Sequence, residues 1–479
     1  MNVRDLEPKI VWNHFSDLNA VPRPSKKEER VIKFMQDFGA KLALDTYTDA
    51  VGNVIIKKPA TAGMEDRQTV IIQSHLDMVH QKNSDTNFDF DTQGIKMYVD
   101  GDWVRANGTT LGADNGMGVA AIMALLSSED IAHPTIEALF TIDEETGMTG
   151  AMELEKGLLK GTILLNLDTE DDDEFSIGCA GGIDTNTTYK YAQASVIAGS
   201  QTYNIIVNGL NGGHSGVQIN EELGNANKIM NRLMYGCEDY NLQIINVDGG
   251  SLRNAIPRES FATIAASPAY LEELERRTQA IKEEYSIQDP NLSIRVEATS
   301  QADKAMSLED TKKVTTALYA VHNGVFRYSR AIEGLVETSS SLARVIVKEG
   351  EFITQSLQRS SLESGKYDVA YTVAAPFYLM GCEVQQKGDY PGWSPNPTSP
   401  ILDILVAKYK ELFNNEEPKV MAIHAGLECG LLGKRYPGLD MISFGPTIKG
   451  AHSPDERCGI KSTAKFWMFL KEILANVPK

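Results

Sequence analysis

The sequence predicts an α/β fold: a mostly parallel sheet built from both ends of the chain, with a second domain inserted between them. Three observations predict it. The chain has 479 residues, more than the roughly 250 to 300 at which a single hydrophobic core stops growing. Its first third alternates apolar, strand-like runs with helical patterns, as parallel α/β sheets do. Its middle part instead carries alternating strands separated by amphipathic helices.

The strands of the predicted sheet are short apolar runs. Residues 69–73, 136–142 and 162–167 form three of them in the first third of the chain, and a helix is expected over 116–126. Residues 439–444 form a similar run near the C-terminus. Because this last run is far from the others in sequence, we expect both ends of the chain to contribute to one sheet.

The middle of the chain has a different pattern. Residues 201–208 and 367–373 alternate apolar and polar side chains, which predicts strands with one buried face. The clearest helix is expected to start near Asn220 and to end at Gly236. One face of this helix carries the apolar residues Leu223, Ala226, Met230, Leu233 and Met234. A stripe at helical spacing predicts packing onto a core.

The domain boundaries follow from breaker residues. The strongest linker signal is the segment 387–400, whose prolines are incompatible with a helix or a central strand. The opposite boundary is placed after the glycine pair at 181–182. These positions predict a discontinuous α/β domain of residues 1–185 and 393–479, and an inserted domain of residues 186–392.

Composition excludes several classes of partner. With 46 Lys and Arg against 65 Asp and Glu, the formal net charge is −19, which argues against nucleic acid and anionic membranes as partners. The first residues form no signal region, and no run approaches about 18 apolar residues, so neither export nor membrane insertion is expected. The five cysteines are odd in number and form no C-x-x-C pair, which predicts buried free thiols in the reducing cytoplasm.

Five short segments share one design: an apolar run ends, and a metal-competent side chain follows at or just beyond its end. They are Ser74-His75-Leu76-Asp77, Gly112-Ala113-Asp114-Asn115-Gly116, Asp143-Glu144-Glu145-Thr146-Gly147, Leu167-Asp168-Thr169-Glu170 and Gly450-Ala451-His452-Ser453-Pro454-Asp455. Ligands of open α/β sheets bind beyond the carboxyl ends of the strands, so we expect these segments to converge. Taken singly, each could be a turn or a structural histidine; together they predict a site.

The segments supply two histidines and three carboxylates as metal ligands, with no thiolate. Such donors suit Zn²⁺, Co²⁺ or Mn²⁺, of which zinc is the commonest. Asp77 lies two residues after His75, where it can hold the imidazole tautomer. The adjacent Glu144 and Glu145 point apart, so one should bind metal and the other should move protons. Because a bound cation lowers the pKa of water from 15.7 to about 7, these donors predict metal-assisted hydrolysis.

Other kinds of chemistry fit the sequence less well. Residues 116–121 match the loose dinucleotide pattern G-x-G-x-x-A, but no apolar strand immediately precedes them. No G-x-S-x-G, H-E-x-x-H or P-loop motif occurs. A non-catalytic metal-binding scaffold is the alternative of a different class. The spare carboxylate beside a ligand, Glu144, favours an enzyme over that scaffold.

The same five segments, in this order, resemble metallopeptidase family M20. The chain length, the large insert and the Gly-Ala-Asp-Asn-Gly and Asp-Thr-Glu variants are similar to those of its bacterial aminoacyl-histidine dipeptidases, a carnosinase-like group. The resemblance implies a zinc-peptidase catalytic domain with an inserted α+β lid domain. It also implies a cytoplasmic enzyme that hydrolyses Xaa-His and related dipeptides by a metal-bound hydroxide. An amidase for tripeptides or N-acyl amino acids stays open as the alternative within the family.

The resemblance implies a ligand set for two Zn²⁺ ions per chain, with Co²⁺ or Mn²⁺ as substitutes. Asp114 would bridge the two ions. His75 and Asp168 would complete one ion, and Glu145 and His452 the other.

The resemblance also implies the residues that act on the substrate, a small peptide. Glu144 would be the general base, and Asp77 would orient the histidine ligand. His214, in the lid, would polarise the scissile carbonyl or stabilise its oxyanion. Asn254 and Arg359 would hold the substrate, since a guanidinium grips a terminal carboxylate bidentately. The long insert leaves open whether His214 acts within its own chain or across a homodimer formed through the lid.

Overall fold

The structure is a computed structural model that describes residues 2–479, and within them the chain packs as two compact units. Unit 1 consists of the residues up to Gly178, Pro395–Ala422 and Leu427–Lys479, and unit 2 of Cys179–Ser394 and Ile423–Gly426. Both ends of the chain therefore build unit 1. The predicted functions of residues 1–185 with 393–479 as a catalytic domain, and of residues 186–392 as a lid, stay predictions.

Unit 1 is built around an eight-stranded mixed sheet. Its strands follow in the order β1 (Asp45–Thr48), β2 (Val54–Lys58), β6 (Ile136–Thr141), β3 (Val70–His75), β7 (Ile163–Asn166), β23 (Asp440–Ser443), β8 (Glu174–Cys179) and β22 (Lys419–Ile423). The strands β6, β3, β7 and β23 run parallel at its centre. At the margins, β1 and β2 pair antiparallel on one side and β8 on the other. The predicted α/β class is confirmed.

The central strands form where the sequence predicts them, because they are runs of β-branched and other apolar residues with both faces covered. Every residue of β3, β6 and β7 is buried, as expected for parallel strands between two helical layers. The predicted run at 439–444 is β23, and it pairs with β7. Both ends of the chain therefore contribute strands to this sheet, as predicted.

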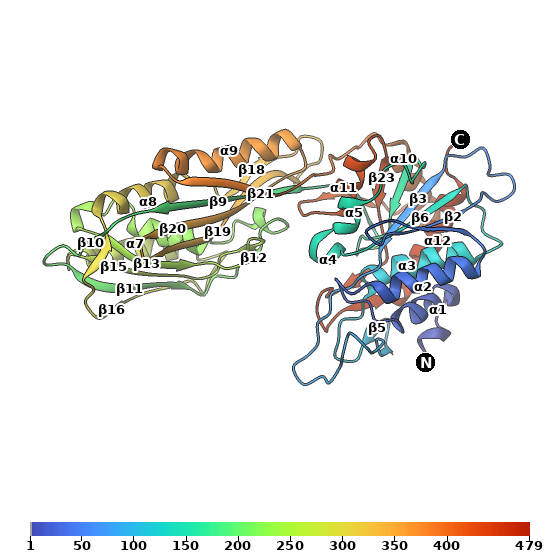
Figure 1. The fold of residues 1–479 in the computed structure, drawn as a ribbon, viewed down its shortest axis with the longest axis horizontal. Helices are drawn as coiled ribbons and strands as arrows, with labels where there is room; N and C mark the ends of the chain where they lie inside the picture. Colours follow the sequence, from blue (N-terminus) through green and yellow to red (C-terminus); the bar gives the residue numbers. More distant parts are fainter. Residues whose placement is uncertain (1) are drawn as a thin grey trace. The chain divides into compact units, whose positions relative to one another are not determined.

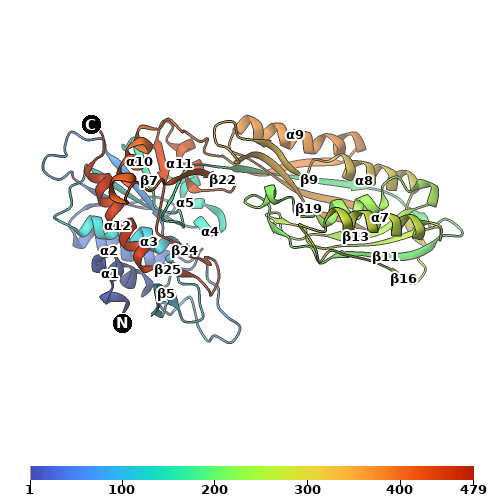
Figure 2. The same ribbon diagram turned by 180° about the vertical axis from the view of Figure 1, so that it is seen from behind.

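Helices cover both faces of this sheet: α1, α2 and α3 lie on one side, and α5 and α11 on the other (Figures 1 and 2). The helices of unit 1 are α1 (Lys9–Asn19), α2 (Glu29–Lys41), α3 (Ala113–Ser127), α4 (Glu144–Gly147), α5 (Thr149–Glu153), α10 (Pro400–Leu412), α11 (Glu428–Arg435) and α12 (Ile460–Ala475). The predicted helix at 116–126 is α3, which is buried along nearly all its length. A small sheet joins β24 (Ile448–Lys449), β25 (Arg457–Gly459), β5 (Trp103–Ala106) and β4 (Met97–Asp100).

Unit 2 is an antiparallel sheet with helices on one face, an α+β arrangement (Figure 1). Its strands are β16 (Ser293–Ala298), β11 (Gln201–Asn208), β15 (Ser260–Ala266), β13 (Gln243–Gly249), β19 (Val336–Lys348), β20 (Glu351–Ser360), β9 (Gly181–Lys190) and β21 (Glu383–Tyr390), with β18 (Gly324–Tyr328) beside β19. Its helices are α6 (Ala226–Met234), α7 (Tyr270–Glu284), α8 (Leu308–Ala320) and α9 (Glu363–Met380). All four helices contribute buried side chains to one core against the sheet.

The predicted strand at 367–373 is wrong, since these residues lie within helix α9. Tyr367, Val369, Tyr371 and Val373 alternate over a short window, but Tyr371 is 61% exposed while its neighbour Ala370 is fully buried. Over the whole helix, the buried residues recur every three or four positions, which is the helical period. Gly381, with φ of 90°, ends the helix in the left-handed conformation that glycine favours.

The predicted helix start near Asn220 is also wrong. Helix α6 begins at Ala226, because the Asn225 side chain accepts hydrogen bonds from the backbone N–H groups of Asn227 and Lys228 and so caps the helix. Upstream, Glu222 has a φ of 56°, which a continuous helix does not allow. The predicted linker is partly a strand as well, since β21 continues to Tyr390 before the prolines end it.

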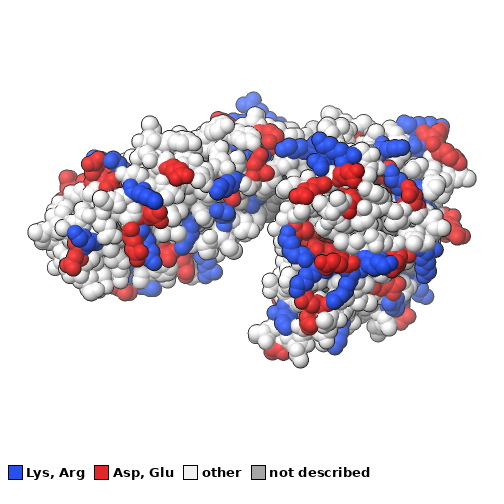
Figure 3. All heavy atoms as spheres, in the orientation of Figure 1, with Lys and Arg blue, Asp and Glu red and all other residues white. Residues whose placement is uncertain are grey.

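Charged side chains are interspersed on the surface. On the face drawn in Figure 3, lysine and arginine alternate with aspartate and glutamate over both units. Within residues 2–479, no helix is both long enough and apolar enough to span a bilayer.

Candidate metal centre and substrate-binding residues

The five predicted metal ligands come together in unit 1, and we call them the metal cluster: His75, Asp114, Glu145, Asp168 and His452. Nε2 of His75 lies 3.2 Å from Oδ1 of Asp114 and 3.6 Å from Oδ1 of Asp168. Nε2 of His452 lies 3.1 Å from Oδ2 of Asp114 and 3.0 Å from Oε2 of Glu145. Each carboxylate oxygen of Asp114 therefore faces a different histidine.

The fold brings these side chains from distant parts of the sequence to one edge of the sheet. His75 ends β3, while Glu145 and Asp168 follow the neighbouring parallel strands β6 and β7. Asp114 is at the beginning of α3 rather than after a strand of the sheet, and His452 follows β24. The carboxyl ends of adjacent parallel strands meet at the same edge, which is why the segments converge.

Helix α3 reaches this edge because of a glycine. A Cβ at Gly118 would clash with the side chains of Asn115 and Ser74 and with the carbonyl oxygen of Leu167. Asn115 in turn donates a hydrogen bond to Oδ1 of Asp168. The absence of a side chain at position 118 thus lets the loop that carries Asp114 lie against the ends of β3 and β7.

Asp77 links the first histidine to the glutamate turn. It lies beyond the end of β3, not on the strand as predicted, yet its Oδ1 is 3.4 Å from Nδ1 of His75. Its carboxylate accepts the backbone N–H groups of Glu144 at 3.0 Å and Glu145 at 3.3 Å. One fully buried carboxylate therefore orients the imidazole and the turn that carries both glutamates.

The metal cluster concentrates negative charge. Burial would lower the pKa of His75, but hydrogen bonds to Asp114 and Asp77 raise it well above its usual value. Hydrogen bonds to Asp114 and Glu145 raise the pKa of His452 to about 11. Burial, together with neighbouring carboxylates, raises the pKa of Asp168 to about 6. A carboxyl group that resists ionisation beside two histidines that hold their protons indicates a site deficient in positive charge.

The donor set fits divalent cations. Ligand atoms of His75, Asp114 and Glu145 lie within 4.8 Å of one another, and Oε1 of Glu145 is buried without a hydrogen-bond partner within residues 2–479. Imidazole and carboxylate donors without thiolate suit Zn²⁺, Co²⁺ or Mn²⁺. The placement of Asp114 between two histidines is the geometry that a carboxylate bridging two ions requires.

Glu144 lies beside the metal cluster without being part of it. Burial raises its pKa well above the usual value, and the charges of Asp168 and Glu428 raise it further. A carboxyl group with a raised pKa next to a cation site is suited to accept and return a proton.

Glu456 is a residue of this site that the sequence analysis did not single out. Its buried carboxylate accepts four backbone N–H groups, from residues 111 to 114, at 2.7 to 3.2 Å. It therefore holds the loop of Asp114 from a position four residues after His452. The signal for it was present in the motif that ends Ser-Pro-Asp-Glu, but a carboxylate that binds backbone has no spacing of its own.

Glu428 lies in the segment 424–430, to which the sequence assigned no definite role. Its Oε2 accepts hydrogen bonds from Gln73 at 2.6 Å and Thr141 at 2.7 Å, side chains near the ends of β3 and β6. Its Oε1 is buried without a partner within residues 2–479. Burial raises its pKa to about 8. This side chain therefore connects the two strands that carry His75 and the glutamate turn.

The predicted substrate-binding residues lie in unit 2. His214 is in β12 (Gly213–His214), which pairs with β14 (Ala255–Ile256), and the carbonyl oxygen of Asn254 accepts the N–H of Ser215 at 2.8 Å. Nδ1 of His214 accepts the N–H groups of Gly216 and Val217 at 3.1 and 3.0 Å. The hydrogen on this imidazole is therefore on Nε2, which leaves that nitrogen as a donor.

Arg359 is not the solvated surface arginine that is its simplest interpretation. It is 4% exposed, its Nη1 donates to the Tyr390 hydroxyl at 2.9 Å, and its buried Nε has no partner within residues 2–479. A Cβ at Gly216 would lie 3.0 Å from this Nε and would clash with the carbonyl oxygen of His424. The loop of His214 therefore packs directly against the guanidinium.

His424 joins this group, and its role was not predicted. Its Nε2 lies 2.7 Å from Oγ of Ser339, a residue that pairs with Arg359 across β19 and β20. Burial and the charge of Arg359 lower the pKa of His424 to about 3 and that of His214 to about 4. Both imidazoles are thus neutral at pH 7, beside a positive charge.

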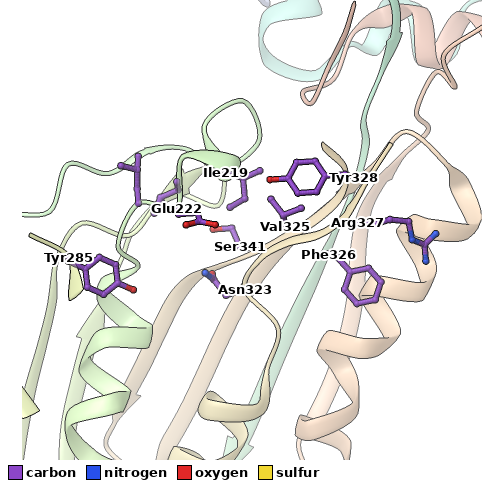
Figure 4. A pocket seen from close by; sticks show the side chains of 12 residues that line it. Ile219, Glu222, Tyr285, Asn323, Val325, Phe326, Arg327, Tyr328 and Ser341 are labelled. Atoms are coloured by element: carbon purple, nitrogen blue, oxygen red, sulfur yellow. The ribbon is translucent and has the colours of Figure 1, made fainter. Parts of the chain in front are cut away.

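A cavity of about 530 Å³ in unit 2 lies elsewhere (Figure 4). Its lining mixes apolar side chains, such as those of Ile219 and Val325, with polar ones, such as those of Glu222, Asn323 and Ser341. Its twelve lining residues include none of the predicted site residues. Cavity volume therefore does not mark the candidate site in this unit.

Comparison with known proteins gives consistent results. The profile of peptidase family M20/M25/M40 matches residues 71–476. The cytosol non-specific dipeptidase of Escherichia coli is 41% identical over 99% of this chain and 98% of its own length. The crystal structure of aminoacylhistidine dipeptidase from Vibrio alginolyticus superposes with a TM-score of 0.94 at 41% identity, covering 100% of this chain and 99% of that one. Aminopeptidase PepT from Bacillus cereus shares the fold, with a TM-score of 0.58 at 16% identity, covering 99% of this chain and 100% of that one.

Proposed function

The chain belongs to peptidase family M20/M25/M40, and we propose that it is a cytoplasmic, zinc-dependent dipeptidase that hydrolyses Xaa-His and related dipeptides. Relatives that are 41% identical over nearly the whole chain carry the names aminoacylhistidine dipeptidase and cytosol non-specific dipeptidase. These two names differ in substrate range, so the histidine preference is the part of the proposal that most needs measurement.

One observation carries the proposal: two imidazoles and three carboxylates from distant segments meet with Asp114 between the two histidines. Asp114 would bridge two Zn²⁺ ions, with His75 and Asp168 on one and Glu145 and His452 on the other. When bound, such ions lower the pKa of water and polarise the scissile carbonyl. A scaffold that only stores metal would not need Glu144, whose carboxyl group lies beside the ligands with a raised pKa.

The protein's own groups would then manage the protons. Glu144 would accept a proton from the attacking water and return it to the leaving amine, a role for which a pKa above the usual range is suited. Asp77 would fix the position of His75 relative to the glutamate turn through its contacts with both. This division explains why two adjacent glutamates are present although one suffices as a ligand.

Residues of unit 2 would recognise the substrate. His214, with its proton on Nε2, would donate to the carbonyl oxygen as charge develops there. Arg359 would bind the terminal carboxylate, since its buried guanidinium keeps an unpartnered N–H within the described chain. Asn254, exposed beside the His214 strand, would contribute a polar contact. Whether these residues serve their own chain or the partner in a lid-mediated homodimer belongs to the same proposal.

A hydrolysis panel tests the function. The metal-free chain, reloaded with Zn²⁺, Co²⁺ or Mn²⁺, is assayed on β-Ala-His, Leu-His, Gly-Gly-Gly and N-acetyl amino acids, with and without chelator. We expect turnover of the two dipeptides, loss of activity with chelator and recovery with zinc. Preference for the tripeptide or the N-acyl amino acid would support the alternative specificity. No turnover of any substrate at full metal occupancy would support the scaffold.

A further inference from the structure

A short segment between α1 and α2, residues 23–26, contacts three loops that carry the metal cluster or its neighbours. It lies outside residues 71–476, the part that matches the family profile. We propose that Arg23, Ser25 and Lys26 are positioning residues that brace the metal centre and thereby set its affinity for metal. The proposal rests on the proposed function, because it assigns a further role in the same site.

Arg23 ties together the two loops that present the first histidine and the bridging carboxylate. It is 1% exposed. Its guanidinium donates to three backbone carbonyl oxygens, those of Leu76 at 3.0 Å, Asp77 at 3.1 Å and Gly112 at 2.6 Å. The guanidinium offers five N–H donors in a rigid fork, which lets this one side chain hold three carbonyls in two loops.

The side chain of Arg23 also meets the negative charge of the cluster. Burial lowers its pKa to about 10, and the carboxylates of Glu456 and Asp77, followed by those of Asp114 and Glu145, oppose this shift. The group therefore keeps its charge at pH 7. Glu456 holds residues 111 to 114 by their N–H groups, and Arg23 holds the same loop by the carbonyl of Gly112. The loop of Asp114 is thus fixed from both sides.

Ser25 holds the carboxylate that orients His75. Its hydroxyl donates to Oδ2 of Asp77 at 2.8 Å, and both residues are buried. The segment also pairs with the loop through its backbone, because the N–H of Met78 donates to the carbonyl of Arg23 and the N–H of Ser25 to that of Met78. Asp77 therefore accepts hydrogen bonds from Ser25 at its side chain and from Arg23 at its backbone carbonyl.

Lys26 holds the third loop, at the residue before the proposed general base. Its Nζ lies 2.5 Å from Oδ2 of Asp143, which is 3% exposed and has a φ of 56°. Carboxylate oxygens of Glu28, Asp77 and Asp143 lie within 4.8 Å of one another. Lys26 supplies positive charge to this acidic group, and the backbone turn that aims Glu144 and Glu145 follows directly from Asp143.

The three contacts converge on one physical role. Asp114 and Glu145 lie outside the strands of the sheet, so contacts from other segments help to fix the loops that carry them. Side chains that orient metal ligands from behind typically contribute 10- to 100-fold to metal affinity or activity. The segment supplies such contacts to the loops of His75, Asp114 and Glu145 at the same time.

The test compares Ser25→Ala, Ser25→Thr, Arg23→Lys and Lys26→Met in the full chain. Zinc affinity of each metal-free variant is measured by competition with a chromophoric chelator, and the Co²⁺ absorption spectrum reports ligand geometry. We expect Ser25→Ala and Arg23→Lys to weaken binding of at least one ion by about 10- to 100-fold, as for other residues behind metal ligands. Ser25→Thr keeps the hydroxyl and should recover affinity to within about threefold of the parent chain.

Steady-state kinetics separate positioning from substrate binding. With zinc saturating, kcat should fall while KM stays within about threefold, because none of the three residues is proposed to touch substrate. Lys27→Met is the matched control for Lys26→Met, since its ammonium pairs with the exposed Asp91. It should leave affinity, spectrum and kinetics unchanged.

Two outcomes are decisive. If Ser25→Ala and Arg23→Lys fold, bind zinc with the parent affinity and give an unchanged Co²⁺ spectrum, the bracing role is wrong. If the parent chain binds two ions but cleaves no peptide, the proposed function fails, while the metal affinities of the variants still decide the role of the segment. Circular dichroism and gel filtration restrict both comparisons to folded protein.

Discussion

The candidate sites of the two units have opposite electrostatic character: negative charge is in excess in unit 1 and positive charge in unit 2. In unit 1, hydrogen bonds to carboxylates of the metal cluster raise the pKa of His452 to about 11, and burial raises that of Glu428 to about 8. In unit 2, burial and the charge of Arg359 lower the pKa of His214 to about 4 and that of His424 to about 3. The first arrangement suits metal ions, and the second suits a carboxylate or an oxyanion.

This difference indicates how one peptidase can divide its chemistry between two bodies. Cations and an anion-binding guanidinium would oppose each other if they shared a single cluster. Separate units let each build up its own excess charge against its own core. The following experiments test that division, beginning with the largest effect.

Replacing Glu144 and Glu145 by glutamine, one at a time, should separate proton transfer from metal binding. Glu144→Gln should lower kcat by about 10³-fold, within the 10² to 10⁴ range of general acid–base catalysis, because an amide cannot accept the proton. It should retain both metal ions, whereas Glu145→Gln should lose one. Metal content by mass spectrometry, measured with the kinetics, distinguishes the two, and loss of metal from the first variant would reverse the assignment.

Removing the side chain of Arg359 should weaken the binding mainly of substrates with a free carboxylate. Arg359→Ala should raise KM for dipeptides by about 10- to 100-fold, since a charged hydrogen bond contributes about 1.5 to 3 kcal/mol. C-terminally amidated dipeptides should change far less. An equal increase for both kinds of substrate would show that Arg359 supports the fold of the unit and does not read the carboxylate.

Weakening the support of Asp114 should lower metal affinity without touching a ligand. Glu456→Gln replaces one acceptor oxygen by an N–H₂ group that faces backbone donors, so zinc should bind at least about tenfold more weakly. Titration of the metal-free variant measures this. Because unit 2 is unchanged, KM of the zinc-saturated variant should remain close to that of the parent. A large change in KM would contradict the assignment of metal binding and substrate recognition to separate units.

The two units of the metal-free chain should respond to acid in opposite directions. The pKa of Glu428 is raised from 4.5 to about 8, so between these values the folded chain binds more protons than the unfolded chain, and unit 1 loses stability as pH rises. The pKa of His214 is lowered from 6.5 to about 4. Between those values the unfolded chain binds more protons, so unit 2 gains stability as pH rises.

Hydrogen exchange can observe both units at once. On lowering the pH from 6.5 to 5, peptides of β3 and α11 should become better protected, and peptides of β12 and β14 less protected, after correction for the intrinsic rate. Zinc should abolish the first response, because bound metal keeps carboxylates ionised. A change of the same sign in both units would contradict the electrostatic difference between them.

The sequence by itself determined the α/β class, the central strands and the candidate metal ligands. Those features are local: β3 and β7 are apolar runs, and His75 and Asp168 stand at or just after their ends. Local patterns also mislead where a short window fits two periods, as in helix α9, whose alternation of Tyr367 to Val373 is only part of a longer helical repeat.

Only the tertiary structure decided which residues support the ligands. Glu456 binds the N–H of Asp114 across 342 positions of sequence, and Arg23 binds the carbonyl of Gly112 across 89. A side chain that hydrogen-bonds backbone needs no particular partner residue, so it leaves no motif at either end of the contact. The ends of strands can be predicted from the sequence because buried residues follow a periodic pattern. Contacts between a side chain and distant backbone arise only when folding brings the loops together.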